Sequence, residues 1–234
     1  MTPKQDLSKI KAVVFDVDGT LYSGGIAFWI IVGDIFRSLL SFNERKVRNE
    51  IKNEDYGNAE VFYKEFFKRL AKKTGKSESY LETWYKDIYM PYMTNVIAKH
   101  KKPRENASKL INSFHDKGIQ VHIFSDYAMG REKIEGLGID TAHIGKYYCA
   151  EDMGALKPVA RLFREICDDL QLQPNEVLMI GDTPGSDGGA VNAGMPFVCI
   201  ESKKTEKIDR SSVAYDIMSW EEVCGLVDIM PSNL

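Results

Sequence analysis

The stretch VVFDVDGTLYSGG, residues 13–25, places two aspartates one residue apart at the end of a short apolar run. Such a run, rich in β-branched residues and bounded by charges, is typical of a strand buried on both faces of a parallel sheet. The strand would end at Asp16, and Asp18 follows with a Gly-Thr pair. The stretch therefore predicts a central strand that delivers two carboxylates to one end of a sheet.

Three further runs resemble this strand in length and apolar character. They are IQVHIFSD at 119–126, EVLMIGD at 176–182 and PFVCI at 196–200. Helical patterns separate them, at 105–118, 157–170 and 189–195, and Pro158 suits the first turn of the second helix. Strands that alternate with helices predict an α/β fold, a doubly wound parallel sheet of Rossmann-like type.

Polar side chains end three of the four predicted strands: Asp16, Ser125 and Asp182. Ligands of doubly wound sheets bind beyond the carboxyl ends of the strands, so we expect these residues to share a site. Asp16 and Asp18 repel one another unless a cation, a proton or hydrogen bonds offset their charge. Mg²⁺ suits a site made of oxygen atoms. The alternative for this stretch is an Asx-type turn that caps the strand.

A long segment without strand signals interrupts the alternation. It contains helical patterns at 58–75 and 79–100, rich in Tyr, Phe and Lys. We therefore predict an α/β core formed by residues 1–21 and 101–234, and an inserted α-helical domain at 22–100.

The motif FDVDGTL resembles the first signature of the haloacid dehalogenase superfamily of phosphohydrolases. Three further signatures follow in order: the Ser that ends VHIFSD, the Lys in GALKP, and the acids of GDTPGSDGGAVNAG. Together they frame the core from residue 13 to the strand at 196–200. The resemblance implies a phosphatase in which the helical insert is a cap that closes over the active site.

The resemblance also implies catalytic roles. Asp16 would attack phosphorus and form an aspartyl-phosphate, and Asp18 would act as general acid and then general base. A dehalogenase typically lacks this second acid, so Asp18 favours phosphoryl transfer. Ser125 and Lys157 would bind the phosphoryl group, and Asp126 would lie at the edge of that site.

A magnesium site is implied as well. Its ligands would be Asp16, the backbone carbonyl of Asp18, and Asp182, with Asp187 as a direct or outer-shell ligand. The fourth signature departs from the usual pattern, because the loop after Asp187 is one residue short before the Gly-Ala pair. Whether Asp187 contacts the metal therefore stays open.

Other polar and aromatic residues have structural alternatives. His122 lies within a predicted strand, where a histidine is usually an interior residue rather than a catalyst. Arg37, Arg45 and Arg48 would bind a second anionic group of the substrate or lie on solvated helix faces. The aromatic residues of the insert would form a stacking surface or pack its helices together.

Composition sets the remaining expectations. The formal charge of −3, from 31 basic and 34 acidic residues, lacks the basic excess of a nucleic-acid-binding protein. The four cysteines stand apart without zinc spacing, and neither a secretory signal nor a long apolar segment occurs. We expect a cytoplasmic protein that binds neither membranes nor nucleic acid; its protein partners are unknown.

Together these patterns predict a magnesium-dependent phosphatase that hydrolyses a small phosphorylated metabolite through an aspartyl-phosphate. One alternative is a sugar phosphomutase, resembling β-phosphoglucomutase, which passes the phosphoryl group to a second hydroxyl. Another is a catalytically silent protein that keeps the fold and binds metal or phosphate for regulation.

Overall fold

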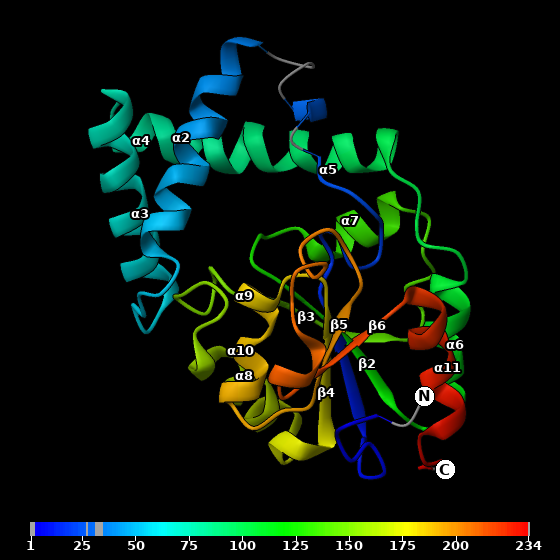
Figure 1. The fold of residues 1–234 in the computed structure, drawn as a ribbon. Helices are drawn as coiled ribbons and strands as arrows, with labels where there is room; N and C mark the ends of the chain where they lie inside the picture. Colours follow the sequence, from blue (N-terminus) through cyan, green and yellow to red (C-terminus); the bar gives the residue numbers. More distant parts are fainter. Residues whose placement is uncertain (1–2, 27, 31–34, 234) are drawn as a thin grey trace.

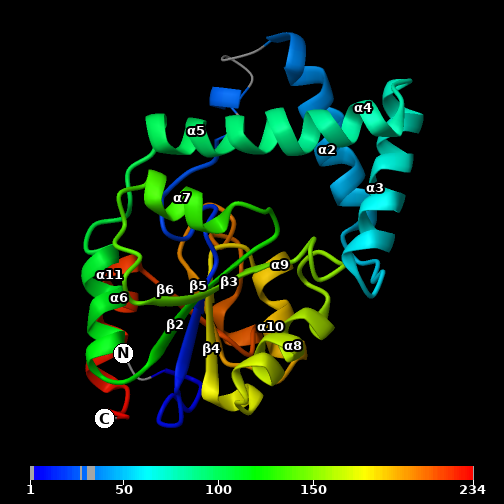
Figure 2. The same cartoon turned by 180° about the vertical axis from the view of Figure 1, so that it is seen from behind.

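The computed structural model describes residues 3–26, 28–30 and 35–233, with side chains except at 35–38. Six parallel strands form one sheet in the order β3-β2-β1-β4-β5-β6, with helices on both faces (Figures 1 and 2). The strands are β1 (Ala12–Phe15), β2 (Gln120–Ser125), β3 (Ile144–Cys149), β4 (Val177–Gly181), β5 (Phe197–Ile200) and β6 (Asp216–Met218). The predicted doubly wound α/β fold is confirmed.

Strand β1 lies between β2 and β4 in the interior of the sheet, and all four of its side chains are buried. Val13 and Phe15 join a core cluster to which α6 (Ala107–Asp116), α7 (Gly130–Gly136) and α11 (Trp220–Ile229) contribute. Ala12 and Val14 join a second cluster on the opposite face, with residues from α8 (Ala160–Leu170) and α10 (Gly189–Asn192). The apolar run therefore fills both cores at once, as expected for a strand covered on both faces.

The four strands expected from the sequence are present, and two more, β3 and β6, had not been predicted. β3 contains Gly145 and Lys146, both exposed, and forms an edge of the sheet, so it lacks the continuous apolar run of a central strand. β6 has three residues. The expected start of α8 was wrong: the helix begins at Ala160, after a cis Lys157-Pro158 bond, so Pro158 lies outside its first turn.

Five helical elements of residues 22–100 form what we call the α2–α5 layer, which lies beyond one end of the sheet (Figure 1). They are α2 (Ile35–Ile51), α3 (Ala59–Thr74), α4 (Glu78–Thr83), the π-helical turn η1 (Trp84–Tyr89) and α5 (Met90–His100). Asn58 caps α3 through its side chain, and Gly75 ends that helix in the left-handed conformation. The described part of this segment contains isolated bridges but no strand. Its division from the core as a separate domain stays a prediction.

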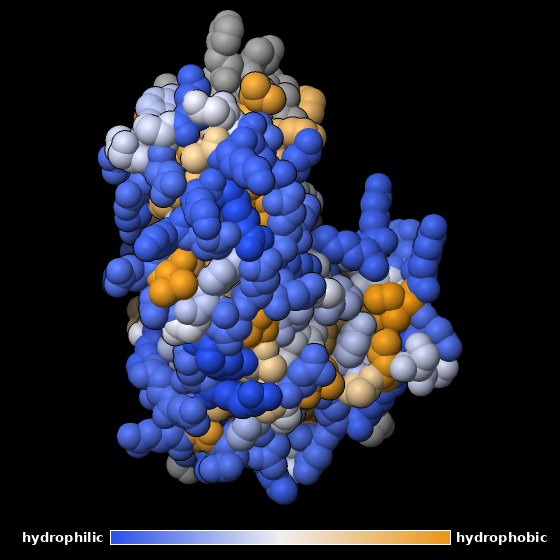
Figure 3. Space-filling model, turned by 90° about the vertical axis from the view of Figure 1, so that its left-hand side faces the viewer, coloured by the Kyte–Doolittle hydropathy of each residue, from blue (hydrophilic) through white to orange (hydrophobic). Residues whose placement is uncertain are grey.

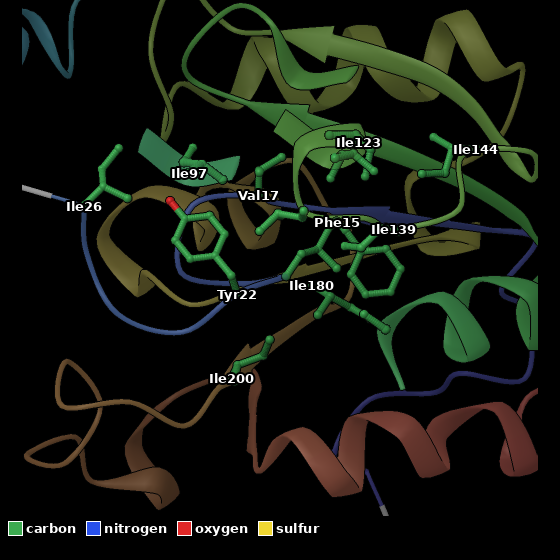
Figure 4. Close-up of a cluster of buried hydrophobic side chains, with 14 of the residues drawn as sticks. Phe15, Val17, Tyr22, Ile26, Ile97, Ile123, Ile139, Ile144, Ile180 and Ile200 are labelled. Carbon is green, nitrogen blue, oxygen red and sulfur yellow. The ribbon is translucent and has the colours of Figure 1, made fainter. Parts of the chain in front are cut away.

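The α2–α5 layer shares its hydrophobic core with the sheet. Figure 4 shows Phe15 and Ile180 of the sheet in one cluster with Tyr22, Ile26 and Ile97. The face drawn in Figure 3 is mostly hydrophilic, with apolar side chains in small separate groups. Six aromatic residues of the described layer are buried: Phe62, Phe66, Phe67, Trp84, Tyr85 and Tyr89. These residues pack helices together.

Polar contacts also join the segment between α2 and α3 to the loop after β3 and to the start of α8. The amide of Tyr56 donates to the carbonyl of Gly154 at 3.0 Å, and Arg161 pairs with Asp55 through two nitrogens. Gly154 has φ +83°, and a Cβ there would lie 2.3 Å from the amide nitrogen of Asn58. Glycine is therefore required where the two segments meet.

No helix in the described part of the chain has the length and apolar character needed to cross a membrane. Cys149, Cys167, Cys199 and Cys224 are all free thiols.

His122, on β2, is an interior residue as expected. Its Nδ1 accepts a hydrogen bond from the amide of Lys146 at 3.1 Å, and its Nε2 lies 3.2 Å from Oε1 of Gln120. Burial, helped by the charge of Lys146, lowers the pKa of His122 to about 4. The ring is therefore neutral in the folded protein at neutral pH.

We expect His122 to make folding pH-dependent. Its pKa is lower in the folded than in the unfolded chain, so the stability is fully present above the unfolded value and is lost as pH falls from about 6.5 to about 4. His122→Asn, which keeps an acceptor for Lys146, should retain on the order of 1 kcal/mol more stability across this interval than the unmodified protein. Urea unfolding of both proteins at several pH values measures this; parallel pH profiles would contradict it.

Candidate active site

The predicted residues meet where the order of the strands reverses. β1 pairs with β2 on one side and with β4 on the other, so the connections after β1 and β4 leave the sheet in opposite directions. Asp16 follows β1, Asp182 follows β4, and Ser125 is the last residue of β2. All three are buried. The backbone of a parallel sheet thus collects side chains from distant parts of the sequence.

Asp16 lies in a buried ion triad. Lys157 donates from Nζ to Oδ1 of Asp16 and to Oδ1 of Asp187, at 2.7 Å in both cases. Oδ2 of Asp16 accepts from the hydroxyl of Thr20 at 2.8 Å. Two carboxylates share one ammonium, so the triad carries an uncompensated negative charge when both acids are ionised.

Burial dominates the acid–base behaviour of this triad. It raises the pKa of Asp16, and Lys157 offsets the shift only in part because Asp187 and Asp18 add repulsion. Burial likewise raises the pKa of Asp187 against the attraction of Lys157. Burial opposes the charge of Lys157, but the two carboxylates outweigh it and hold the pKa of the lysine well above its usual range. The triad is therefore suited to accept further positive charge.

Asp18 has its own cation. Its Oδ2 accepts from Nζ of Lys133 at 2.6 Å, and its Oδ1 accepts from the hydroxyl of Tyr22 at 2.7 Å. Burial would raise the pKa of Asp18, but Lys133 and Tyr22 outweigh burial and hold the pKa below its usual range. Asp16 and Asp18 thus pair with different lysines, so no single ammonium group has to compensate for both carboxylates.

Three acids lie close enough to hold a metal ion. Oxygen atoms of Asp16, Asp182 and Asp187 are within 4.8 Å of one another, and all three residues are buried. Gly19, with φ +102°, leaves room for this cluster, because a Cβ there would lie 2.4 Å from Oδ2 of Asp182. Oδ2 of Asp182 accepts from Lys204 at 2.7 Å. Buried, oxygen-only donors with excess negative charge fit a hard divalent cation such as Mg²⁺.

Ser125 and Asp126 border this cluster. Oγ of Ser125 accepts from the amide of Tyr127 at 3.2 Å, and Oδ1 of Asp126 accepts from the amide of Lys157 at 2.8 Å. Asp126 therefore fixes the backbone that carries the lysine of the triad. The structure thus brings together the acids, the serine and the lysine that the four signatures predicted for the site.

Two cavities flank the triad. One, of about 610 Å³, is lined by Asp18, Gly19 and Asp182 from the core and by Met93 and Arg45 from the α2–α5 layer, among others. The other, of about 260 Å³, lies between the end of α2 and the core loops. Arg45 lines both cavities.

Some residues at the site had not been singled out from the sequence: Thr20, Tyr22, Lys133 and Lys204. Thr20 belongs to the quoted motif, and Tyr22 follows it closely, so their spacing was the available signal. Lys133 and Lys204 lie far along the chain in segments without a motif. Arg48, considered as an anion ligand, is buried and forms ion pairs with Glu44 and Glu151. The side chain of Arg37 lies outside the described residues.

Comparison with known proteins agrees with these features. A family model described as haloacid dehalogenase-like hydrolase matches residues 10–194. The glyceraldehyde 3-phosphate phosphatase of Methanothermobacter thermautotrophicus is 27% identical over 84% of this chain and 88% of its own length. The phospholysine phosphohistidine inorganic pyrophosphate phosphatase of Danio rerio is 28% identical over 50% of this chain. That match spans 46% of the Danio protein, about half its length.

Solved structures agree at the level of the fold. The L-2-haloacid dehalogenase of Xanthobacter autotrophicus superposes with a TM-score of 0.63 and 18% identity, covering 94% of this chain and 98% of that one. The likeness therefore includes the α2–α5 layer as well as the sheet.

We expect Mg²⁺ to stabilise the protein through the acid cluster. At a concentration 100 times Kd, binding to the folded state alone contributes about 2.7 kcal/mol, on the order of a 5–10 °C rise in Tm for a chain of this size. Asp182→Asn should remove most of this rise, because it deletes one of three charged donors. Asp116→Asn, an exposed acid on α6, is the control and should keep it. Equal Mg²⁺-dependent shifts in the two variants, measured by thermal unfolding, would place the metal elsewhere.

Proposed function

The chain belongs to the haloacid dehalogenase-like hydrolases, and from this premise we propose that it is a magnesium-dependent phosphatase acting through an aspartyl-phosphate at Asp16. The observation that carries the proposal is the buried triad of Asp16, Lys157 and Asp187 with Asp18 two residues away. A nucleophile, a cation for the phosphoryl group and a separate acid–base group are then available within one site.

In the first half-reaction a carboxylate oxygen of Asp16 attacks phosphorus, and the bond from phosphorus to the leaving oxygen breaks. Asp18 donates a proton to that oxygen, which leaves as an alcohol. Lys157 and the hydroxyl of Ser125 bind phosphoryl oxygens. A bound Mg²⁺, held by Asp16, Asp182, Asp187 and the backbone carbonyl of Asp18, would supply charge neutralisation between the carboxylate and the phosphate.

In the second half-reaction Asp18 removes a proton from water, and the resulting hydroxide attacks phosphorus. The bond from phosphorus to Asp16 breaks, phosphate is released and the Asp16 carboxylate is restored. The lowered pKa of Asp18 favours its ionised form, which is the form that can accept a proton in this step. The negative charge of a bound phosphate ester favours protonation of Asp18 in the first step.

Asp16→Asn should reduce phosphate release by about 10³-fold or more, because the amide is a poor nucleophile for phosphorus. The variant keeps the size of the side chain, so binding of a nonhydrolysable phosphate analogue should persist. Mass spectrometry of the unmodified protein quenched in acid during turnover should detect one phosphoryl group on the peptide that contains Asp16. Full turnover by Asp16→Asn would exclude the mechanism.

The smaller cavity favours a substrate with a second anionic group. Arg45 and Arg48 of α2 and Lys52, the residue after this helix, line the cavity, and Asp126 is the single acid among the lining residues. Arg48 is neutralised by its two carboxylate partners, whereas Arg45 and Lys52 form no ion pair with any residue that the structure describes. We propose that Arg45 and Lys52 bind a carboxylate or a second phosphoryl group on the leaving group.

The name of one relative is consistent with a second phosphoryl group on the substrate, and the name of the other with a phosphate ester that has no second anionic group. One relative is named for inorganic pyrophosphate among its substrates and the other for glyceraldehyde 3-phosphate. A screen of this chain should therefore include inorganic pyrophosphate, phosphoglycolate and glycerol 3-phosphate, which carry a second phosphoryl group, a carboxylate and no second charge, respectively.

Joint replacement by Arg45→Ala and Lys52→Ala should lower kcat/KM by about 10–100-fold for pyrophosphate or phosphoglycolate, as expected when charge-assisted hydrogen bonds are lost. Hydrolysis of glycerol 3-phosphate should change less than about 3-fold, because it has no group for this cavity. Lys46→Ala, an exposed neighbour on α2, serves as the control. Equal losses on all three substrates would contradict the assignment of the cavity.

The alternatives remain distinguishable by product analysis. A phosphomutase would convert one sugar phosphate into another without releasing phosphate. A silent regulatory protein would bind Mg²⁺ and release no phosphate from any ester in the screen.

A further inference from the structure

Lys133 is a fully buried lysine that the proposed mechanism does not use. It lies on α7, and its relative exposure is 0%. Its ammonium is 2.6 Å from Oδ2 of Asp18 and 5.1 Å from the centre of the Tyr127 ring. A buried ammonium is costly unless a partner compensates for its lost hydration, and here the carboxylate of Asp18 is that partner.

Neither the solubility of the protein nor direct contact with the substrate explains why a lysine occupies this buried position. A side chain with no exposed surface contributes nothing to the charge of the surface. Lys133 also lines neither of the two cavities that flank the triad, whereas Asp18 and Tyr127 do. Any influence of Lys133 on the reaction therefore passes through the residues that it contacts.

The contacts of Lys133 fix the orientation of the Asp18 carboxylate. Oδ2 accepts from Lys133 and Oδ1 accepts from the hydroxyl of Tyr22, so each oxygen of the carboxylate has its own hydrogen-bond donor. Tyr22 is itself almost completely buried. Rotation of the carboxylate about its bond to Cβ would break both hydrogen bonds at once.

Helix α7 provides a rigid base for this contact. Ile134, the residue after Lys133, is completely buried in the larger core cluster. Gly136 faces α5 so closely that a Cβ there would lie 3.0 Å from Cβ of Ala98. The backbone that carries Lys133 is therefore packed between the sheet and the α2–α5 layer.

We propose that Lys133 is a positioning residue for the reaction, which holds the Asp18 carboxylate in the orientation needed to transfer a proton to the leaving oxygen. The inference rests on the proposed role of Asp18 and adds a residue that none of the signatures contains. A purely structural ion pair would affect all substrates alike. A positioning role predicts instead that the loss of kcat/KM depends on how strongly the leaving group needs a proton.

The test compares two substrates that differ in this need. Departure of glycerol from glycerol 3-phosphate requires protonation, whereas p-nitrophenolate departs from p-nitrophenyl phosphate without it. Lys133→Met removes the ammonium and keeps an unbranched stem. We expect kcat/KM, which reports steps through departure of the leaving group, to fall by about 10–100-fold for glycerol 3-phosphate and by less than about 3-fold for p-nitrophenyl phosphate.

Controls separate this effect from loss of folded protein. A smaller folded fraction would lower kcat/KM by the same factor for both substrates, so the ratio of the two kcat/KM values does not depend on the folded fraction. Lys133→Arg should restore part of the ratio, because a guanidinium can still donate to Asp18. Lys99→Met, on an exposed face of the neighbouring α5, should leave the ratio unchanged.

Asp18→Asn supplies the reference pattern. It should show the same selective loss on glycerol 3-phosphate, and adding Lys133→Met to it should cost less than a further 3-fold, since the two residues act together. If Asp18→Asn is selective and Lys133→Met is not, or if their losses multiply, the inference is overturned. If Asp18→Asn shows no selectivity, the proposed acid–base role of Asp18 itself fails.

Discussion

The structure depends on the mutual repulsion of four carboxylates gathered at the carboxyl ends of the strands. Asp16, Asp182 and Asp187 lie in one buried cluster, and Asp18 lies beside it. Such a group is unstable in a low-dielectric interior unless cations approach it. Lysines from three separate segments do so: Lys157 before α8, Lys133 on α7 and Lys204 after β5. The segments that carry these lysines therefore pack against the acids at the carboxyl ends of the strands.

The same constraint explains why the site can be both stable and reactive. Lys157 is shared by two acids, so the cluster keeps a need for positive charge that its own lysines do not meet. That need is what a divalent cation and the electron-poor phosphorus of a substrate would satisfy. Asp18 pairs separately with Lys133, so its charge is compensated independently of Asp16, although only Val17 separates the two in sequence.

The α2–α5 layer bears on this chemistry through a charged contact of its own. Arg48 of α2 pairs with Glu44 of the same helix and with Glu151 in the loop after β3, and all three are buried. Breaking a buried ion pair costs about 3–5 kcal/mol when a partner is left unpaired. If the layer is a mobile cap, as the family resemblance implies, opening must keep these charges together or hydrate them.

The sequence by itself determined the fold class, the family and the set of acids at the strand ends. Apolar runs such as the one before Asp16 depend on local composition, and the order of the four signatures is preserved whatever the loops do. It did not reveal β3 or β6, because an exposed edge strand and a three-residue strand lack a continuous apolar run. Only the tertiary structure decided which lysine neutralises which acid. The sequence around Lys133 does not distinguish it from an exposed lysine. Its burial results from the packing of α7 between the sheet and α5.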